Sequence, residues 1–415
     1  MSLREWMSTP LADHCEIFSG YPFASAEFTD DEADIHLVKG ENIGQGEVLW
    51  DISKRWPKSQ FDDLKRFHLA PGDVVLAMDR PWVPAGLKFA QIGYDAPLAL
   101  VVQRVARLRA CRQLVPAYLP CLIASPQFES YIQNAVRGVT VPHISGKEIG
   151  AFRFLLPPVV TQRAIGRVRK DFDDLIDNNR RRIKLLEDSV RLLFNEWFVR
   201  LRFPGHDRST FSDGIPSGWT RSSLHQVARG LEDGDWIESK DQGGEDFRIL
   251  QISNIGLNDF RETGNLRFIT DETFRRLRCR EVTPGMILIA RMPTPIGRAM
   301  MVTDMRWRMV TAVDVGILEP DDDSLDRYVL LYHLNSAENL ARCAGRTVGA
   351  TRPRVTRREL AELPLLIPDK RTQHAFREVA VDVQAQRHVL SRQIEKVRAA
   401  RDLLLPRLMS GELAV

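Results

Sequence analysis

The chain contains one arrangement of residues twice, and the second copy follows the first by 211 positions. The segment Gly138-Val-Thr-Val-Pro-His-Ile-Ser matches Gly349-Ala-Thr-Arg-Pro-Arg-Val-Thr. The same spacing then continues without a gap through Ile149 and Leu360, Leu155 and Leu366, Pro157 and Pro368, Gln162 and Gln373, Val168 and Val379, Ile183 and Ile394, and Leu193 and Leu404. A register held over so many positions indicates an internal repeat, so each half should form the same structural unit.

The front of each half predicts a β-rich globular domain. Looser matches pair Asn42-Ile43-Gly44 with Asn254-Ile255-Gly256, and Pro71-Gly72-Asp73 with Pro284-Gly285-Met286. Short apolar runs at residues 74–77, 98–102, 286–290 and 310–317 are bounded by Pro, Gly and Asp, which is typical of strands and turns. We expect Asn42 and Asn254 to hold a turn at a strand end rather than to read adenine.

The back of each half predicts a long helix. From Gln162 to Val199, residues that are apolar with few exceptions recur at spacings of three and four, and the second half repeats this pattern 211 residues later. The pattern is that of a coiled coil with one stutter, so the two helices should pack together. At ~1.5 Å per residue such a helix would span about 57 Å, a length that suggests a spacer.

These patterns predict the fold class α/β (α+β), with two globular mixed domains, two long helices and a pseudo-two-fold internal repeat. Pro204-Gly205 ends the first helix, and Ile215-Pro216-Ser-Gly-Trp219 restarts globular structure. The expected limits are 1–158 for the first domain, 159–203 for the first helix, 204–214 for a linker, 215–368 for the second domain, and 369–415 for the second helix and tail.

Composition excludes several classes of protein. The chain has 415 residues, 44% hydrophobic and 27% charged, which is typical of a folded chain with two to four domains. Its net charge of +3 does not by itself indicate a nucleic-acid binder. The five cysteines are scattered without a C-x-x-C pair, so we expect neither disulfides nor a metal site and place the chain in a reducing cytosol. No signal peptide or membrane span is expected.

Catalytic motifs are missing from the sequence. There is no Walker A pattern, no H-E-x-x-H, no G-x-S-x-G and no Asn-Pro-Pro-aromatic motif. The acidic residues Asp171, Asp173, Asp174, Glu187 and Asp188 on the first helix are interpreted as a solvated or partner-binding face rather than a nuclease site.

The chain resembles the specificity subunits of Type I restriction-modification enzymes. The likeness is carried by Ile43 and Ile255 with their flanking Asn and Gly, the Gly-x-Thr-x-Pro loops at 138 and 349, Pro157-Pro158 with Gln162, Pro368 with Gln373, Phe194-Asn-Glu-Trp-Phe-Val-Arg, Ile215-Pro-Ser-Gly-Trp219, Gly234-Asp-Trp-Ile-Glu-Ser239 and Leu408-Met-Ser-Gly-Glu-Leu413. Together these phrases cover nearly the whole chain.

The resemblance implies a non-catalytic subunit that reads a bipartite DNA target. Two target-recognition domains would each read one half of the site, and the two helices would pair antiparallel. Two methyltransferase subunits would dock beside the helices and restriction subunits would join them. The chain would bind no cofactor itself, and S-adenosylmethionine and ATP with Mg would belong to the partners. Two alternatives to this function stay open: a self-sufficient restriction or methylation enzyme, and a coiled-coil scaffold that binds no DNA.

An arginine-rich segment is the strongest candidate for DNA contact. Six arginines and one acid lie between Arg342 and Glu359, and the guanidinium fork suits both phosphate and the O6/N7 edge of guanine. Val141 and His143 stand where the second copy has Arg352 and Arg354, so roles cannot be copied between halves. The candidate DNA contacts are Arg80, Lys88, Arg137, Lys147, Arg291, Arg298, Arg346, Arg352, Arg354 and Arg357. The candidate partner-binding residues on the helices are Asp174, Glu187, Phe194, Trp197 and Arg398.

Overall fold

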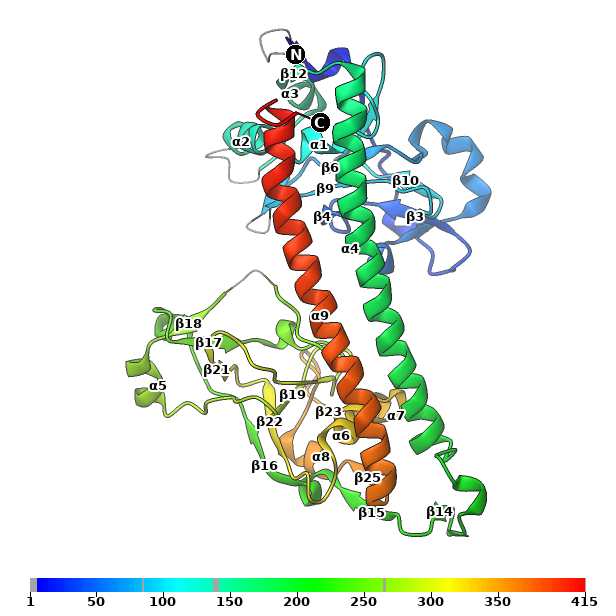
Figure 1. The fold of residues 1–415 in the computed structure, drawn as a ribbon, viewed down its shortest axis with the longest axis vertical. Helices are drawn as coiled ribbons and strands as arrows, with labels where there is room; N and C mark the ends of the chain where they lie inside the picture. The colour runs from blue at the N-terminus through cyan, green and yellow to red at the C-terminus, as the bar shows by residue number, and fades with distance from the viewer. Residues whose placement is uncertain (1–5, 84–85, 137–141, 264–265, 415) are drawn as a thin grey trace. The chain divides into compact units, whose positions relative to one another are not determined.

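The structure is a computed structural model that describes residues 6–83, 86–136, 142–263 and 266–414. It separates into two compact units, each containing sheets, short helices and part of both long helices (Figure 1). The first unit comprises Met1–Asn179 and Arg392–Val415, and the second comprises Arg180–Ser391. The mixed fold class predicted from the sequence is confirmed. Each unit holds one half of each long helix, whereas the sequence-based limits treat the helices as separate segments.

The first unit is built on a five-stranded sheet. Its strand order is β2 (Cys15–Ser19), β11 (Val105–Ala110), β6 (Val74–Ala77), β9 (Phe89–Gln91) and β4 (Gln45–Gly46). A three-stranded sheet has the order β10 (Ala99–Val101), β3 (Ile35–Val38) and β5 (Arg55–Trp56), with β10 and β3 parallel. The pair β1 (Met7–Pro10) and β12 (Arg153–Leu156) and the hairpin β7 (Trp82–Val83) and β8 (Gly86–Leu87) complete the strands described.

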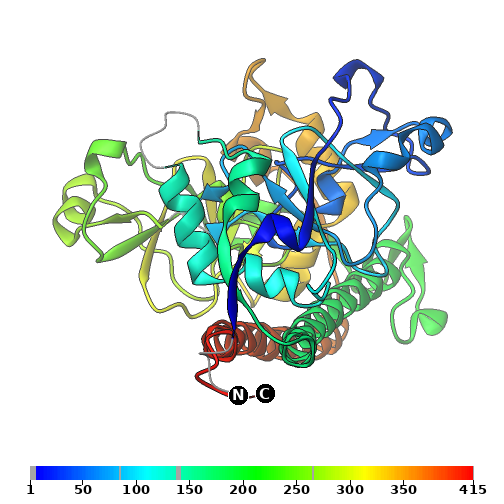
Figure 2. The ribbon, with the colours of Figure 1, turned by 90° about the horizontal axis from the view of Figure 1, so that it is seen from above.

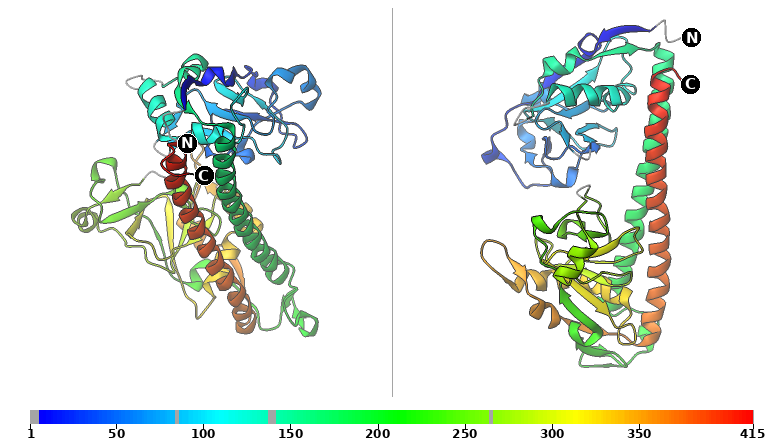
Figure 3. Two further views of the ribbon diagram at one scale, coloured as in Figure 1. Left: turned by 45° about the horizontal axis from the view of Figure 1, so that its top comes forward. Right: turned by 90° about the vertical axis from the view of Figure 1, so that its left-hand side faces the viewer.

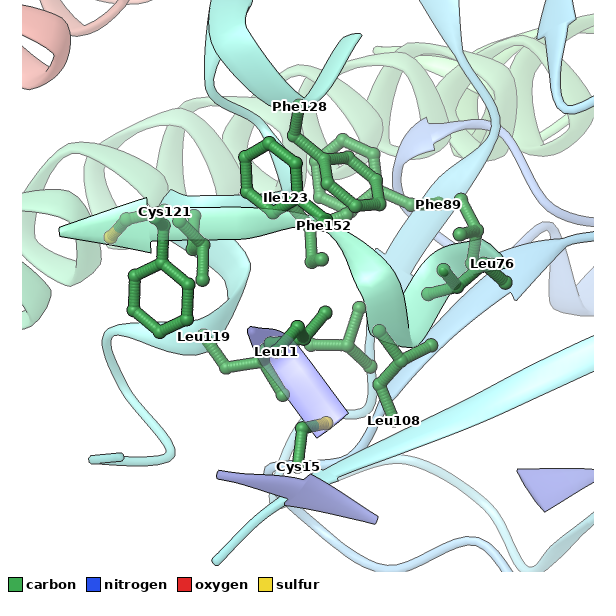
Figure 4. Close-up of a cluster of buried hydrophobic side chains, with 14 of the residues drawn as sticks. Leu11, Cys15, Leu76, Phe89, Leu108, Leu119, Cys121, Ile123, Phe128 and Phe152 are labelled. Atoms are coloured by element: carbon green, nitrogen blue, oxygen red, sulfur yellow. The ribbon is translucent and has the colours of Figure 1, made fainter. Parts of the chain in front are cut away.

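The core of the first unit lies between the five-stranded sheet and three short helices. These are α1 (Leu119–Ile123), α2 (Pro126–Ala135) and α3 (Gly146–Ala151). Leu76 and Leu108 on the sheet, Ile123 and Phe128 on the helices, and Leu11 converge in one buried cluster (Figure 4). Burial of such side chains stabilises the unit by about 1.5–3 kcal/mol each before entropy is counted.

The second unit repeats this plan. Its main sheet has the order β16 (Ala228–Asp233), β22 (Val315–Pro320), β19 (Ile287–Ala290) and β20 (Ala299–Met301). The smaller sheet has the order β18 (Phe268–Ile269), β17 (Phe247–Leu250) and β21 (Arg308–Thr311), again with a parallel pair, β17 and β21. The pair β15 (Thr220–Ser223) and β25 (Pro364–Ile367) matches β1 and β12. The short helices are α5 (Asp271–Leu277), α6 (Arg327–Leu334), α7 (Ala337–Gly345) and α8 (Arg357–Ala361).

The repeat extends to individual hydrogen bonds. Buried Gln162 accepts from Val115 N at 2.8 Å and donates to Pro157 O at 2.8 Å. Gln373, 211 residues later, accepts from Asp326 N at 2.9 Å and donates to Pro368 O at 2.6 Å. Because both amides link the start of a long helix to the domain in front of it, they explain why this glutamine recurs.

Two further repeated positions have backbone roles. Asn42 Oδ1 accepts from Lys39 N at 2.7 Å and Asn254 Oδ1 accepts from Gln251 N at 2.9 Å, which confirms that both asparagines hold turns. Gly20 and Gly234 allow close backbone approach. A Cβ at Gly20 would lie 2.3 Å from a carbonyl oxygen of β10, and one at Gly234 would lie 2.2 Å from the carbonyl oxygen of Ala312.

The long helices α4 (Val159–Phe194) and α9 (Lys370–Met409) run side by side (Figures 1 and 2). In the first unit Asp173 pairs with Arg401 at 2.8 Å, while Asn179 on α4 bonds to α9 nearer its start. In the second unit Phe194 packs edge-to-face against Phe376, with ring centroids 5.9 Å apart. As the residue numbers increase along α4, the numbers of the residues that they contact on α9 decrease, which confirms antiparallel pairing. A π-helical turn, Asn195–Val199, follows α4.

Candidate nucleic-acid interface

The arginine-rich segment of the second unit forms a short hairpin. Strands β23 (Thr347–Val348) and β24 (Arg354–Val355) pair antiparallel between α7 and α8, and Gly349 adopts a φ of +94° at the turn. In the right panel of Figure 3 this hairpin projects from the second unit on the side opposite to α9. Within this unit the hairpin backbone therefore lies away from α9.

Four of the predicted arginines lie on or beside this hairpin with their side chains open to solvent. Arg352 is exposed, and the Arg354 side chain is 51% exposed with its Nη1 3.5 Å from Asp314. Arg346 lies 3.8 Å from Glu359, and Arg357 lies 3.9 Å from Asp233. Such long contacts at the surface contribute little stability, so these guanidinium groups can turn to another acceptor.

Arg291 and Arg298 occupy a different environment from the hairpin arginines. Both are 7% exposed. Arg291 Nε donates to Val355 O at 3.0 Å and its Nη1 pairs with Asp233, so it joins the end of β24 to the main sheet. Arg298 donates to four backbone carbonyl groups, and burial lowers the pKa of its guanidinium. These two side chains hold loops together, and their contact with DNA stays a prediction.

The first-unit candidates are less clustered. Arg80 is exposed, has a φ of +45° and donates its backbone N–H to Pro142 O at 2.7 Å, while Lys147 is exposed on α3. Lys88 Nζ binds Gly40 O, and burial lowers the pKa of its amine. Arg137 lies outside the described residues, as does most of the Gly138 loop.

Sequence reasoning missed a polar cluster at the end of that loop. His143 Nδ1 lies 2.6 Å from Asp79 Oδ1, and Arg104 Nη1 lies 2.7 Å from Asp79 Oδ2. Partial burial raises the pKa of Asp79, but the hydrogen bonds from His143 and Arg104 outweigh it and lower the pKa overall. In the second unit Arg354 contacts Asp314, which directly precedes β22 as Arg104 directly precedes β11, so the carboxylate comes from a different loop. The sequence offered one indication of a role for His143: the 211-residue register pairs it with Arg354.

The helix candidates divide into exposed and packed residues. Asp174, paired with Lys170, and Arg398 are exposed. Phe194 is 3% exposed and packs with Phe376, while Trp197 is half-buried beside the same ring. Glu187 pairs with Arg387, and burial is the main reason that the pKa of its carboxyl is raised. Several apolar side chains that the sequence analysis did not single out are instead exposed on the helices: Leu185, Leu192, Val389 and Leu403.

The described residues provide no metal site, because no three His, Cys, Asp or Glu side chains among them gather in a way that could hold a metal ion. No helix among the described residues is long and apolar enough to cross a membrane.

Comparison with known proteins identifies related chains. The Type I restriction enzyme MjaVIII specificity subunit of Methanocaldococcus jannaschii is 25% identical over 46% of this chain and 45% of its own length. The EcoAI specificity subunit of Escherichia coli is 29% identical over 41% of this chain and 28% of its own length. The MjaIX specificity subunit of M. jannaschii is 20% identical over 79% of this chain and 76% of its own. The chain thus matches less than half the length of the first two relatives.

A crystal structure of the Type-I restriction-modification system S subunit from M. genitalium matches 97% of this chain and 96% of its own at 13% identity, with a TM-score of 0.49. No protein-family model matches the chain. The resemblance to Type I specificity subunits that the repeated phrases indicate is confirmed, because all three curated relatives described above carry that name.

Proposed function

We propose that this chain recognises DNA for a Type I restriction-modification system and catalyses no reaction itself. The observation that carries the proposal is the repeat: two units share one hydrogen-bonded framework but differ in the charge of the loops that precede α3 and α8. Two domains with differently charged loops on one chain suit a bipartite, asymmetric DNA target. The names of the curated relatives, all specificity subunits of Type I restriction enzymes, support a recognition role.

The hairpin arginines are the proposed readers of the second half-site. Exposed guanidinium groups on Arg352 and Arg354 can each form two hydrogen bonds to guanine O6 and N7, which discriminates between bases. Arg346 and Arg357 lie nearer the base of the hairpin, where we expect phosphate contact. Phosphate contacts set position without reading sequence.

The remaining candidates divide by their environment. In the first unit Arg80 and Lys147 are the exposed cations proposed to reach DNA, and Arg137 remains a proposal from sequence alone. Lys88, Arg291 and Arg298 already donate to protein carbonyl groups or pair with a protein carboxylate. We therefore propose that these three act indirectly, by holding the loops that carry the contacting residues.

The partners proposed for this chain are two methyltransferase subunits and the restriction subunits. S-adenosylmethionine, ATP and Mg would be bound by those subunits, in the cytosol where the DNA lies. The exposed apolar residues Leu185, Leu192, Val389 and Leu403 on α4 and α9 are suited to a protein partner, because large apolar side chains on a helix surface favour burial in an interface. Exposed Asp174 and Arg398 would flank such contacts.

The test is to map methylated adenines in the host genome with and without this gene. A bipartite methylated motif should disappear when the gene is deleted. The purified chain should bind duplex DNA weakly and transfer no methyl group until a methyltransferase subunit is added. Methyl transfer by the chain alone, or an unchanged methylation map, would contradict the proposal.

A second arm of the test separates the two units. Replacing residues 1 to about 150 with the front of another such protein should change one half of the motif only, because the repeat predicts that each unit reads its half independently. Loss of both halves in a stable variant would show that the units do not read independently. A scaffold that binds no DNA would show no salt-dependent shift with any duplex.

A further inference from the structure

The second unit contains a cavity whose lining includes four arginines. It has a volume of about 530 Å³, within the size range of ligand pockets. It lies between β16 and α8, which are neighbours in Figure 1. Four arginines and a histidine line it against one carboxylate, that of Asp233; the basic residues are His225, Arg229, Arg291, Arg357 and Arg358. A concave surface with this excess of positive charge attracts anions.

The charges of the cavity are only partly compensated. Arg291 pairs directly with Asp233, and Arg357 lies 3.9 Å from the same carboxylate. Arg229 contacts the partly buried Asp321 at 3.4 Å and the exposed Asp323 at 4.0 Å. The exposed guanidinium of Arg358 has no hydrogen bond or ion pair among the described residues. The cavity therefore has donors to offer to a further acceptor.

Local backbone geometry points one of these arginines at the cavity. Strand β16 shifts register against β22 between Ala228 and Gly230, so Arg229 forms a β-bulge. Bulges change the direction of a side chain and are frequent beside functional sites. A Cβ at Gly230 would meet nothing nearer than 3.9 Å, so the strand leaves open space at this point.

The first unit provides an internal comparison, because it keeps a cation at the position of Arg358, where Lys147 stands 211 residues earlier, but not at the positions of Arg291 and Arg357. Met78 follows β6 as Arg291 follows β19, and each accepts a backbone hydrogen bond from the repeated loop, Ile144 N to Met78 O at 2.9 Å and Val355 N to Arg291 O at 3.2 Å. Met78 there faces Ser19, with Oγ 3.6 Å from Sδ, where the second unit has Arg291 and Asp233.

The corresponding space is also closed in the first unit. Gly146 stands 211 residues before Arg357, and a Cβ at that glycine would lie 3.4 Å from a methyl group of Ile17. At Gly150 the same isoleucine would lie 3.3 Å away. The open space and the charges of Arg291 and Arg357 are therefore properties of the second unit, whereas a cation at the Arg358 position belongs to both units.

We propose that this cavity binds a phosphate group, held by Arg229, Arg357 and Arg358 with the Arg291–Asp233 pair behind them. Arginine presents a planar fork that matches phosphate oxygens. The favoured source is the DNA backbone, and that assignment rests on the proposed function, because α8 directly follows the arginine hairpin. Free phosphate is the other source of the same chemistry, and the experiment separates the two.

The test uses the full chain and the variants Arg358→Ala and Arg221→Ala. Arg221 is an exposed arginine on β15 of the same unit, outside the cavity, so it is the matched control for loss of charge. Binding of a labelled duplex of unrelated sequence is measured by fluorescence anisotropy over a range of salt concentrations. Binding of inorganic phosphate is measured separately by titration calorimetry.

A DNA phosphate in the cavity predicts that Arg358→Ala lowers the slope of log K against log salt by about 0.9, while Arg221→Ala leaves it unchanged. If the variant and the wild type bind equally at 1 M salt, this smaller slope makes the variant bind about eightfold more weakly than the wild type at 0.1 M salt. Unchanged DNA binding with loss of phosphate heat only in Arg358→Ala supports the site with free phosphate as its source. Wild-type behaviour of Arg358→Ala in both assays overturns the inference.

The inference and the proposed function can fail separately. If the wild-type chain binds no duplex but binds phosphate through Arg358, the cavity site stands and the DNA-recognition proposal falls. If the wild-type chain binds duplex and Arg358→Ala matches it in both assays, the DNA-recognition proposal stands and the cavity site falls.

Discussion

Replacing Arg298 with Ala should destabilise the second unit more than it should remove a DNA contact. Arg298 is 7% exposed, and its guanidinium donates to Ile255 O at 2.7 Å, Pro293 O at 2.7 Å, Pro295 O at 3.1 Å and Ile252 O at 3.0 Å. A hydrogen bond from a charged donor contributes about 1.5–3 kcal/mol net. If water reaches half of the freed carbonyl groups, the loss is about 3–6 kcal/mol, a large share of the stability of one domain.

Hydrogen exchange followed by mass spectrometry on the full chain measures this loss in each unit separately. Amides of β19 and β20 should exchange about 10²–10⁴ times faster in Arg298→Ala, at a factor of ten for each 1.4 kcal/mol. Amides of β6 in the first unit should not change, and the control Arg221→Ala should match the wild type throughout. Arg298→Lys keeps the charge but cannot reproduce the fork, so it should recover little protection.

The refuting result is specific. Wild-type protection in Arg298→Ala, together with weaker DNA binding that Arg298→Lys restores, would show that the side chain acts as a charge on DNA. The sequence-based assignment of Arg298 as a direct DNA contact would then stand, and the indirect role proposed from its four carbonyl partners would be wrong.

Three further predictions concern other residues. Gln162→Ala or Gln373→Ala should lower the free energy of unfolding by about 1–3 kcal/mol, because buried groups lose their hydrogen-bond partner, and only in the unit that contains the substitution. If amide hydrogen exchange rose equally in both units of either variant, this prediction would be wrong. Burial raises the pKa of Asp235 to about 6, so its contribution to stability is present below pH 3.8 and is lost as pH rises through 6. Urea unfolding of Asp235→Asn should therefore lack this fall in the free energy of unfolding, which is about 3 kcal/mol in the wild type. A parallel fall in the variant would assign it to other groups. Replacing Arg352 or Arg354 with Ala should weaken binding to the cognate target by about 1–3 kcal/mol for each lost base contact. An unchanged affinity and salt slope in both variants would remove the hairpin from the interface.

Much of the architecture can be predicted from local sequence patterns. The 211-residue register predicts two equivalent units, and the matched bonds of Gln162 and Gln373 show that equivalence atom by atom. The spacing of three and four along each long helix predicts α4 and α9, because helical periodicity depends only on residues close in the chain. The turn role of Asn42 could be predicted for the same reason, since its acceptor and donor groups lie within five residues.

The environment of each arginine was decided only by the tertiary structure. Arg298 lies three residues after Pro295 and Arg352 directly precedes Pro353, both in turn-like segments, yet Arg298 is buried against four carbonyl groups and Arg352 is exposed. The partners of Arg298 come from residues 252 to 295, and the cationic cavity joins β16 to α8 across more than a hundred residues. Burial and charge compensation depend on groups that meet only after long-range packing, whereas periodicity and turn chemistry are properties of neighbours along the chain.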